Sequence, residues 1–497
     1  MITKLILPKY VTDFMAVFSK AGYEIYIVGG AVRDLFLSIS DLPNRPNLTY
    51  EVDLGAKQKP DSIKNWDFAT NATPEQIQKL FPDSFYNNNY GTVSIPTNIS
   101  SSHSRPDRES ISIDIDPHFR GDDSFDKTVI FEVTPFRKES NYSDSRHPDK
   151  IDWAKTIEED LSRRDFTINS IAYDGKKLID ITGGIEDLKN KLIRAVGDPD
   201  KRFSEDGLRL MRAIRFASEL GFLIEDNTLT AIKKNAELIK NISWERIATE
   251  FLKILASEHP AEGVLFLRSC NLLKEILPEL DNCFSIEQKS PGRHHIYDVG
   301  THSIEALRHC SSSDPITRFA TLIHDIGKAE AFAKDDTGLI TFHNHEHIGA
   351  KMASKIADRF HLPKEYKKKL VTLVRFHMFS VTENQTDKAL RRFIRNVGVE
   401  NLDDILAVRL GDRIGSGAKP TSWRTELFKK RLVEVQNIPF TIKDLRVNGN
   451  DVMDILKIKP GPKVGEILEK IFEKVDNQEL ENKREDLLKE IIKYKSN

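Results

Sequence analysis

The sequence predicts an α+β fold in which a head of mixed strands and helices precedes a long all-α remainder. In the stretch 23–34, YEIYIVGGAVRD, a β-branched alternating run meets a glycine pair and then helical spacing, which indicates strand, tight turn and helix. Residues 65–70 and 129–134 are alternating or β-branched runs that predict two further strands. The later segments 204–220 and 464–475 have the apolar spacing of amphipathic helices.

Length and composition indicate a soluble protein of several domains. A chain of 497 residues allows about two to four domains, and no apolar run is long enough to span a bilayer. The first residues, MITKLILPKY, lack a secretory apolar region, so we expect a cytoplasmic protein. The three cysteines lack metal-binding spacing. Because the formal net charge is −2, an RNA partner would have to bind local basic patches, such as those at 364–369, 388–395 and 424–431.

The glycine pair Gly29-Gly30 is a candidate phosphate cradle. Without a Cβ, these residues let backbone amides approach a phosphate, and the following helix adds the positive end of its dipole. Arg33 falls in the first turn of that helix, where its guanidinium group can fork onto a phosphate. A glycine pair between strand and helix is also an ordinary connection, so partners elsewhere in the chain must distinguish the two interpretations.

Asn65 and Asp67 are candidate magnesium ligands. Residues two apart in a strand face the same side, and a Mg²⁺ ion that bridges a nucleoside triphosphate takes oxygen ligands. Glu132, within the strand expected at 129–134, is a third candidate. Two polar stretches, 38–64 and 98–128, predict loops inserted into the head.

A second polar cluster follows a helix that begins at Ile157. The adjacent Arg163 and Arg164 offer guanidinium groups to triphosphate oxygens, while Asp165 and Asn169 offer hydrogen-bonding groups to ribose hydroxyls.

The segment 204–220 is expected to form one helix with a charged face. Asp206 and three arginines recur every three residues and should share that face, the arginines being Arg209, Arg212 and Arg215. A solvated helix would more usually alternate the sign of its charges.

Five ordered motifs, VGGAVRD, NWDFATNATPEQIQKLFP, FEVTPFR, RRDFTINSIA and RFSEDGLRLMRAIRF, resemble the class II tRNA nucleotidyltransferase and bacterial poly(A) polymerase family. The resemblance covers most of residues 20–256 apart from the two insertions. It implies a polymerase β-like head, Mg²⁺ as cofactor, and tRNA, CTP and ATP as partners. It also implies that Glu205, Asp206 and Arg209 hydrogen-bond the edge of the incoming base. Such a pattern selects C and A, whose bases carry an exocyclic amine.

The chain departs from this family at the metal site, where the family pattern is Asp-x-Asp and this sequence has Asn65. An amide oxygen can still ligate Mg²⁺, but the site loses one negative charge. Glu51, Asp53 and Glu132 are candidates to restore that charge. We expect an active enzyme with Asp67 as the principal ligand.

Histidines cluster after residue 290. An early His, a His-Asp dipeptide and a later Asp resemble the HD phosphohydrolase superfamily through LIHDIGK, FHNHEHIGA and RFHMF. A divalent metal in such a site lowers the pKa of bound water and so supplies a hydroxide nucleophile. The resemblance implies that one metal is bound by His302, His324, Asp325 and Asp412, with His345 and His377 near a substrate phosphate or a second ion.

These features predict four regions: a nucleotidyltransferase head at 1–180, a helical neck at 181–285 that binds the nucleotide base and RNA, an HD domain at 286–420, and a helical body and tail at 421–497. The predicted reaction is addition of C, C and A to tRNA. Three alternatives stay open: a poly(A), CC-only or A-only adding enzyme; an HD hydrolase with an impaired transferase head; and a non-catalytic RNA-binding protein. The sequence predicts neither the oligomeric state nor the metal of the HD domain.

Overall fold

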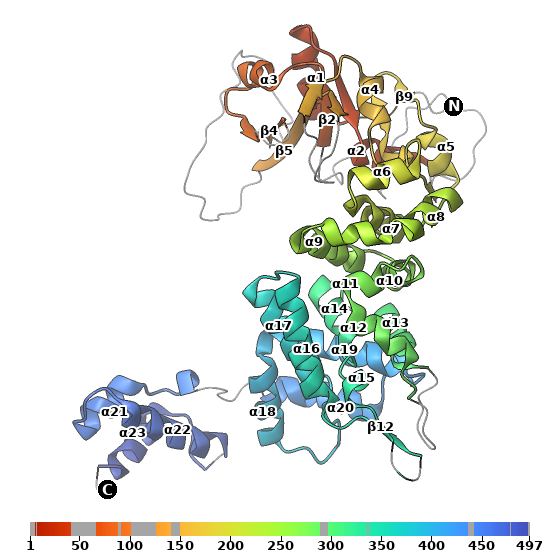
Figure 1. Cartoon of the computed structure of the whole chain (residues 1–497). Helices are drawn as coiled ribbons and strands as arrows, with labels where there is room; N and C mark the ends of the chain where they lie inside the picture. Colours follow the sequence, from red (N-terminus) through yellow and green to blue (C-terminus); the bar gives the residue numbers. More distant parts are fainter. Residues whose placement is uncertain are drawn as a thin grey trace. The chain divides into compact units, whose positions relative to one another are not determined.

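The computed structural model divides the chain into two compact units, Met1–Ser243 and Trp244–Asn497 (Figure 1). Asn65, Glu51 and Asp53 lie outside the described residues, as does most of both expected insertions, 38–64 and 98–128. The structure describes residues 5, 7–40, 66–87, 91–100, 126–140, 150–288, 297–334, 336, 338–435, 442–477 and 479–495.

A mixed seven-stranded sheet lies at the centre of the first unit, in the order β3-β4-β5-β2-β1-β8-β9. The neighbours β2 and β5 are parallel, and the other neighbouring pairs are antiparallel. The three strands predicted from the sequence, β1, β2 and β5, are confirmed and are adjacent. The strands of this sheet are β1 (Ile25–Val28), β2 (Trp66–Thr70), β3 (Phe85–Asn87), β4 (Thr92–Ser100), β5 (Asp126–Pro135), β8 (Ile171–Tyr173) and β9 (Leu178–Asp180).

In the part of the chain that the structure describes, three short strand pairs lie outside this sheet. They are β6 (Arg137–Ser140) with β7 (Lys150–Trp153), β10 (Leu192–Ile193) with β11 (Leu223–Ile224), and β12 (Ala333–Lys334) with β13 (Ile340–Thr341).

Helices pack against both faces of the large sheet. From one side, Phe14 of α1 contacts Phe68 of β2, with ring centroids 4.9 Å apart. Because neighbours in a strand face opposite sides, Ala69 belongs to the other face, where it packs in one apolar cluster with Ile157 of α4. Asp67, two residues before Ala69, therefore also faces the α4 side. The helices of this unit are α1 (Lys9–Lys20), α2 (Gly30–Ser40), α3 (Pro74–Leu80), α4 (Ile157–Ser162), α5 (Gly184–Lys189), α6 (Pro199–Glu205), α7 (Leu208–Leu220) and α8 (Asp226–Lys234).

The prediction of one continuous helix over 204–220 is wrong, because the chain breaks between α6 and α7. Asp206 has extended backbone angles, with φ −149° and ψ 107°. Gly207 then approaches Leu238 so closely that an added Cβ would lie 2.8 Å from the Leu238 carbonyl oxygen. This close tertiary approach accompanies the break, and the local apolar spacing gives no sign of it.

The second unit is helical apart from β12 and β13 in its described part. Its core includes Phe251, Phe319 and Phe360, whose ring centroids lie 5.2, 5.6 and 5.8 Å apart. Among the described residues, no helix combines the length and apolarity needed to cross a bilayer. Its helices are α9 (Trp244–Ala256), α10 (Pro260–Ser269), α11 (Leu273–Ile276), α12 (Pro278–Asp281), α13 (Val299–Arg308), α14 (Pro315–Ile323), α15 (Lys328–Ala331), α16 (His345–Arg359), α17 (Lys364–Phe376), α18 (Asp387–Val397), α19 (Leu402–Gly415), α20 (Trp423–Val435), α21 (Gly449–Leu456), α22 (Pro462–Asp476) and α23 (Arg484–Lys493).

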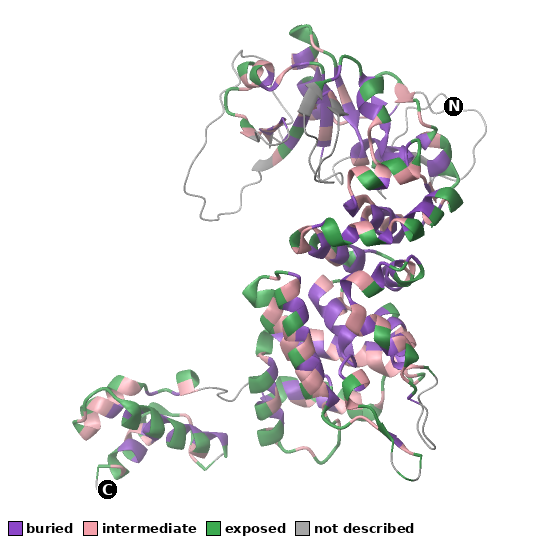
Figure 2. Cartoon of the chain, in the orientation of Figure 1, coloured by how far each residue is buried: buried purple, intermediate pink, exposed green. Residues whose placement is uncertain are grey.

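The last three helices share an apolar core of their own, and Figure 2 shows their inward sides buried. Val452, Ile471 and Leu487, one from each helix, are fully buried in it. The amphipathic helix predicted over 464–475 is therefore confirmed as part of α22.

The basic stretches noted in the sequence are partly neutralised. Arg391 of α18 is buried, and its Nε donates to Asp476 of α22 at 2.7 Å. Arg424 pairs with Glu383 at 2.6 Å. The stretch 388–395 therefore joins α18 to α22 through ion pairs as well as contributing positive charge to the surface.

Candidate active sites

The strand, turn and helix predicted around the glycine pair are confirmed. Gly29 has a φ of 67°, in the left-handed region that favours glycine. A Cβ on Gly29 would lie 3.3 Å from Arg164 Nη1, and a Cβ on Gly30 would lie 3.6 Å from Arg33 Nη2. Two guanidinium groups therefore lie against the bare turn at the start of α2. Backbone amides, a helix N-terminus and two cations together suit the oxygens of a phosphate chain.

Asp160 of α4 holds the two adjacent arginines. Its Oδ1 accepts from Arg163 Nη2 at 2.7 Å, and its Oδ2 accepts from Arg164 Nη2 at 2.9 Å. Burial alone would raise the pKa of Asp160, but the two guanidinium groups outweigh it and hold this pKa far below its usual range. The sequence interpretation missed Asp160. The available signal was an acid three and four residues before two arginines on an expected helix.

Asn169 connects the two arginines of the glycine turn. Its side-chain Oδ1 accepts from Arg33 Nη1 at 3.0 Å, and its backbone carbonyl accepts from Arg164 Nη1 at 3.3 Å. Arg33 Nε also donates to Asp34 at 2.8 Å. Asn169, predicted as a ribose contact, thus fixes the positions of both guanidinium groups.

Asp165 pairs with Arg212, and the ring of Phe216 contacts Arg33, Arg212 and Arg215. Arg212 Nη2 lies 2.6 Å from Asp165 Oδ2. Burial would raise the pKa of Asp165, but Arg212 and a second arginine lower it below the ordinary value. The guanidinium carbons of Arg33, Arg212 and Arg215 lie 5.5, 5.3 and 4.2 Å from the centroid of Phe216. The sequence interpretation did not single out this aromatic ring.

Asp206 and Arg209, the residues expected to read the base, lie at the break between α6 and α7. Asp206 Oδ1 accepts from the backbone nitrogen of Leu208 at 3.0 Å. Because Asp206 lies outside α7, the charged face predicted for four residues is reduced to the three arginines. Arg209, Arg212 and Arg215 each pair with a different carboxylate, at 2.6, 2.6 and 3.7 Å, on Glu205, Asp165 and Glu219 respectively.

Asp67 and Glu132 lie in register on the parallel strands β2 and β5. Burial raises the pKa of Asp67, and Glu132 raises it further, while Arg164 opposes the rise. A divalent cation between these carboxylates would relieve their repulsion, so the pair has the donor chemistry of a Mg²⁺ site beside the glycine turn. The third candidate ligand, Asn65, lies outside the described residues.

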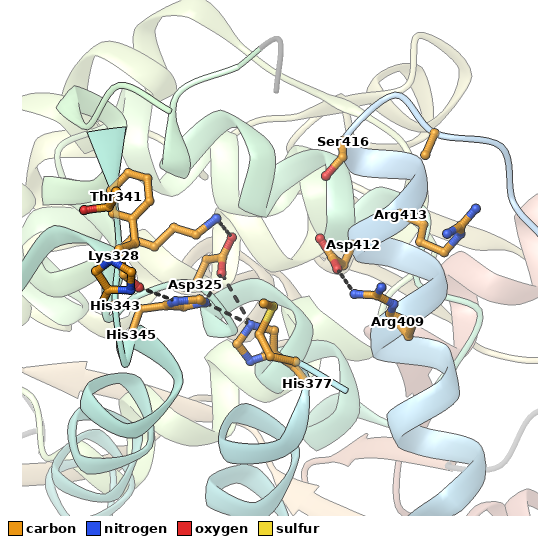
Figure 3. A pocket seen from close by; sticks show the side chains of 13 residues that line it. Asp325, Lys328, Thr341, His343, His345, His377, Arg409, Asp412, Arg413 and Ser416 are labelled. Atoms are coloured by element: carbon orange, nitrogen blue, oxygen red, sulfur yellow. Dashed lines mark hydrogen bonds and ion pairs between the residues drawn. The ribbon is translucent and has the colours of Figure 1, made fainter. Parts of the chain in front are cut away.

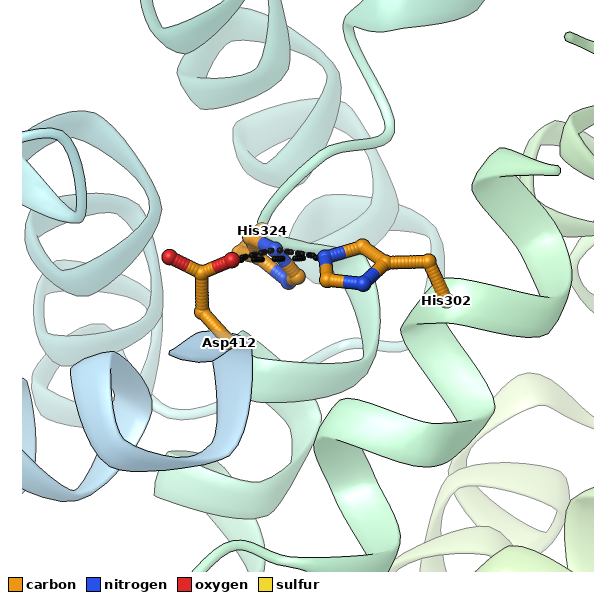
Figure 4. A group of neighbouring side chains, drawn as sticks. All are labelled: His302, His324 and Asp412. Atoms are coloured by element: carbon orange, nitrogen blue, oxygen red, sulfur yellow. Dashed lines mark hydrogen bonds and ion pairs between the residues drawn. The ribbon is translucent and has the colours of Figure 1, made fainter. Parts of the chain in front are cut away.

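The histidine cluster of the second unit forms two adjoining groups, in each of which the ligand atoms lie within 4.8 Å of one another. The first group is His302 of α13, His324 at the end of α14 and Asp412 of α19 (Figure 4). The second group is Asp325, His345 and His377 (Figure 3). All six residues singled out in the sequence are therefore brought together, although Asp325 falls in the second group.

Asp325 nevertheless lies between the two groups. Its Oδ2 is 3.3 Å from His324 Nε2, and its Oδ1 is 3.2 Å from His345 Nε2. Burial lowers the pKa of His324, but Asp325 and Asp412 outweigh burial and raise it to about 10. A metal ion would replace this proton. A carboxylate between two histidine groups is an arrangement that suits a pair of metal ions.

The cradle, the paired carboxylates and the mixed sheet together define the class of polymerase β-like nucleotidyltransferases. Three family models match this chain, and the first supports the class assigned to the head. Residues 25–194 match the Poly A polymerase head domain. Residues 221–284 match the "Probable RNA and SrmB-binding site of polymerase A". Residues 342–491 match tRNA nucleotidyltransferase domain 2.

Similarity to individual known proteins identifies the family within this class. The CCA-adding enzyme of Levilactobacillus brevis is 30% identical over 471 residues, which cover 94% of this chain and 92% of the relative. The A-adding tRNA nucleotidyltransferase of Deinococcus radiodurans is 36% identical over 64% of this chain and 75% of the relative. The crystal structure of the Bacillus stearothermophilus CCA-adding enzyme in complex with CTP has a TM-score of 0.65 and 25% identity, over 99% of this chain and 98% of that chain. This chain therefore belongs to the family of CCA-adding enzymes and related tRNA nucleotidyltransferases.

Proposed function

We propose that this protein adds C, C and A in order to the 3′ end of tRNA, using CTP and ATP without a nucleic-acid template. The observation that supports this most directly is the in-register pair Asp67 and Glu132 beside the turn at Gly29. The full-length similarity to the Levilactobacillus brevis CCA-adding enzyme supports the choice of C, C and A.

The side chains divide the work by their chemistry. Gly29, Gly30, Arg33, Arg163 and Arg164 bind the triphosphate. Asp67 and Glu132, with Asn65, would hold Mg²⁺, and the ion would supply positive charge to offset the negative charge of the phosphates. The tRNA 3′ oxygen forms a bond to the α-phosphorus, the bond to pyrophosphate breaks, and the hydroxyl proton passes to solvent. Asp165 and Asn169 contact the ribose, and Asp206 and Arg209 contact the base. Arg212 and Arg215 lie on the same helix as Arg209, and Arg212 pairs with Asp165.

Product lengths test this proposal. A tRNA that lacks its 3′ CCA is incubated with Mg²⁺ and labelled CTP, ATP or both. We expect two additions with CTP alone and a third with both nucleotides, after which addition stops. Extension only of a tRNA ending in CC would replace the proposal with A-only addition, and a long A run would replace it with poly(A) synthesis. Absence of incorporation, also with Mn²⁺ and in Asn65→Asp, would contradict it.

Replacing Gly29 by alanine is expected to destabilise the head by about 1 kcal/mol and to weaken CTP binding about tenfold. The φ of 67° strains alanine, and the new methyl group meets Arg164 at 3.3 Å. Thermal unfolding and CTP titration measure the two effects. Gly22 is a matched control, because its φ is 83° and an added Cβ meets nothing within 4 Å among the described residues. Equal CTP binding by Gly22→Ala and Gly29→Ala would contradict the cradle.

We also propose that the histidine cluster is a metal-dependent phosphohydrolase site of the HD type. The position of Asp325 between two histidine groups favours this second function. The donor set fits divalent transition metals, because imidazoles and carboxylates converge within 4.8 Å. A bound metal would supply hydroxide from water at neutral pH. The metal itself is to be identified by elemental analysis of the purified protein.

Replacing Asp412 by asparagine is expected to lower the metal content and to reduce phosphate-ester hydrolysis about 100-fold, because one charged ligand is lost. Mass spectrometry for metals and phosphate release measure the two effects. Addition of C and A to tRNA should stay within about twofold of the wild type. Asp404 is a matched control on the same helix, since it pairs with Lys369 at 2.6 Å instead of with the histidines. Equal metal content in both variants would contradict the proposed ligand.

A further inference from the structure

Two cavities lie side by side along helix α19. One, of about 420 Å³, is lined by four members of the histidine cluster, Asp325, His345, His377 and Asp412. The other, of about 460 Å³, lies between α19 and α20. Arg409 and Arg413 line both cavities. We call these two side chains, on successive turns of α19, the shared wall. Figure 3 shows the Arg409 guanidinium group beside Asp412, with the Arg413 side chain extending away from it.

The shared wall keeps donors available for an anion. Arg409 Nη1 donates to Asp412 Oδ2 at 3.1 Å. Arg413 donates to the backbone carbonyl of Lys419, with Nε at 3.3 Å and Nη2 at 3.1 Å. A guanidinium group has five N–H donors, so each arginine can also bind phosphate oxygens. Lys328 also lines the first cavity, but its ammonium group already pairs with Asp325 and donates to Gln288, so the anion would depend on the two arginines.

The lining of the second cavity is mostly apolar and partly aromatic, and its charged residues are Asp403, Arg409, Arg413 and Lys429. Phe379 and Phe428 are stacked in its lining, with ring centroids 5.2 Å apart and ring planes 23° apart. Leu406 and Leu410 of α19 line it as well. The guanidinium carbon of Arg409 lies 5.6 Å from the Phe379 ring, which places the boundary between charged and apolar surfaces at this side chain. The apolar part of this lining can accept a flat apolar group, while Arg409 and Arg413 also face the neighbouring cavity.

We propose that the two cavities form one elongated site for a phosphate monoester whose alcohol part carries a flat, apolar group. The phosphate lies against Arg409 and Arg413 beside the histidine cluster, and the apolar group lies against Leu406 and Phe379. This inference rests on the hydrolase function proposed above. In hydrolysis, a water oxygen forms a bond to phosphorus, the bond between phosphorus and the alcohol oxygen breaks, and that oxygen takes a proton. The products are the free alcohol and inorganic phosphate.

Binding of two phosphonates, which cannot be hydrolysed, tests the site. Phenylphosphonate and methylphosphonate are titrated into the full chain by calorimetry, with and without added Mn²⁺. We expect phenylphosphonate to bind about tenfold more tightly. Leu406→Gln should reduce that preference below about threefold while leaving methylphosphonate affinity unchanged. Arg413→Gln should weaken both ligands about tenfold, whereas Arg392→Gln, a change to an exposed arginine on α18, should weaken neither.

Equal affinities for the two phosphonates, a preference that survives Leu406→Gln, or failure of both to bind would overturn the inference. A hydrolysis assay with phenyl phosphate and methyl phosphate distinguishes failure of the inferred site from failure of the proposed hydrolase function. Hydrolysis of both esters at equal rates would overturn the inference and keep the hydrolase. Binding with the expected preference but without hydrolysis, whichever metal is supplied, would keep the site and remove the hydrolase.

Discussion

Alanine in place of Asp67 is expected to lower the rate of nucleotide addition about 1,000-fold, which corresponds to about 4 kcal/mol of lost transition-state stabilisation. Asp67 faces the side of the sheet on which Ala69 packs with Ile157 of α4, and it lies in register with Glu132. If Asn65 contributes a neutral oxygen, the charge of the metal site depends on these two carboxylates. The loss of either should therefore cost more than it would in a site with three acids.

Single-turnover addition of one C to a tRNA lacking CCA measures this effect. Asp67→Asn keeps the shape of the side chain and should lose nearly as much activity, since the missing quantity is charge. Without metal, neither variant should be less stable than the wild type, because burial and Glu132 raise the pKa of Asp67 and so disfavour its ionised form at pH 7. Addition within tenfold of the wild-type rate would exclude Asp67 as the principal ligand.

Local patterns in the sequence were sufficient for the parts of the head that depend on backbone periodicity. The glycine pair, β1 and β2 follow from alternation and turn chemistry, and Asp67 follows from its place in the alternation. The pairing of Asp67 with Glu132 was accessible only as a hypothesis, because the register of β2 against β5 depends on contacts between segments far apart in the chain.

Features that depend on tertiary contacts were not predicted. The break at Asp206 accompanies the approach of Leu238 to Gly207, which the apolar spacing of 204–220 does not encode. The composition of the stretch 388–395 predicts a basic patch, yet Arg391 is buried against Asp476. Charges that are adjacent in sequence therefore do not establish an exposed cationic surface.

The histidine cluster was predictable for a different reason. Its members are distinctive residue types in a fixed order, and their joint occurrence indicates a site even though they lie on separate helices. The sequence does not predict its division into two groups, with Asp325 between them. His324 and Asp325 are adjacent in the chain, yet their side chains belong to different groups. The apolar cavity beside it has no sequence signature, since Leu406 and Phe379 resemble ordinary core residues.

Asparagine in place of Asp160 is expected to raise the KM for CTP about 30-fold and to destabilise the head by about 2 kcal/mol at pH 7. The carboxylate fixes both Arg163 and Arg164, and Arg164 lies against Gly29. The stability loss is at the lower end for a buried ion pair because the arginine side chains remain 21% and 20% exposed. Steady-state kinetics of C addition and guanidinium unfolding measure the two effects.

Asp187 provides the matched control, because it is also a buried acid in the head and pairs with Arg194 at 3.0 Å. Asp187→Asn should destabilise the head to a similar degree but leave the KM for CTP unchanged, which separates positioning of the phosphate-binding arginines from loss of stability.

The pH dependence of stability gives a second test of Asp160. The pKa of Asp160 is lowered in the folded protein, so its contribution is complete above the unfolded pKa of about 4 and is lost as the pH falls towards the folded value. The stability difference between wild type and Asp160→Asn should therefore be constant from pH 8 to about pH 5 and shrink below about pH 4. A difference that instead shrank between pH 5 and 8 would mean that the two arginines do not hold Asp160 in its ionised form.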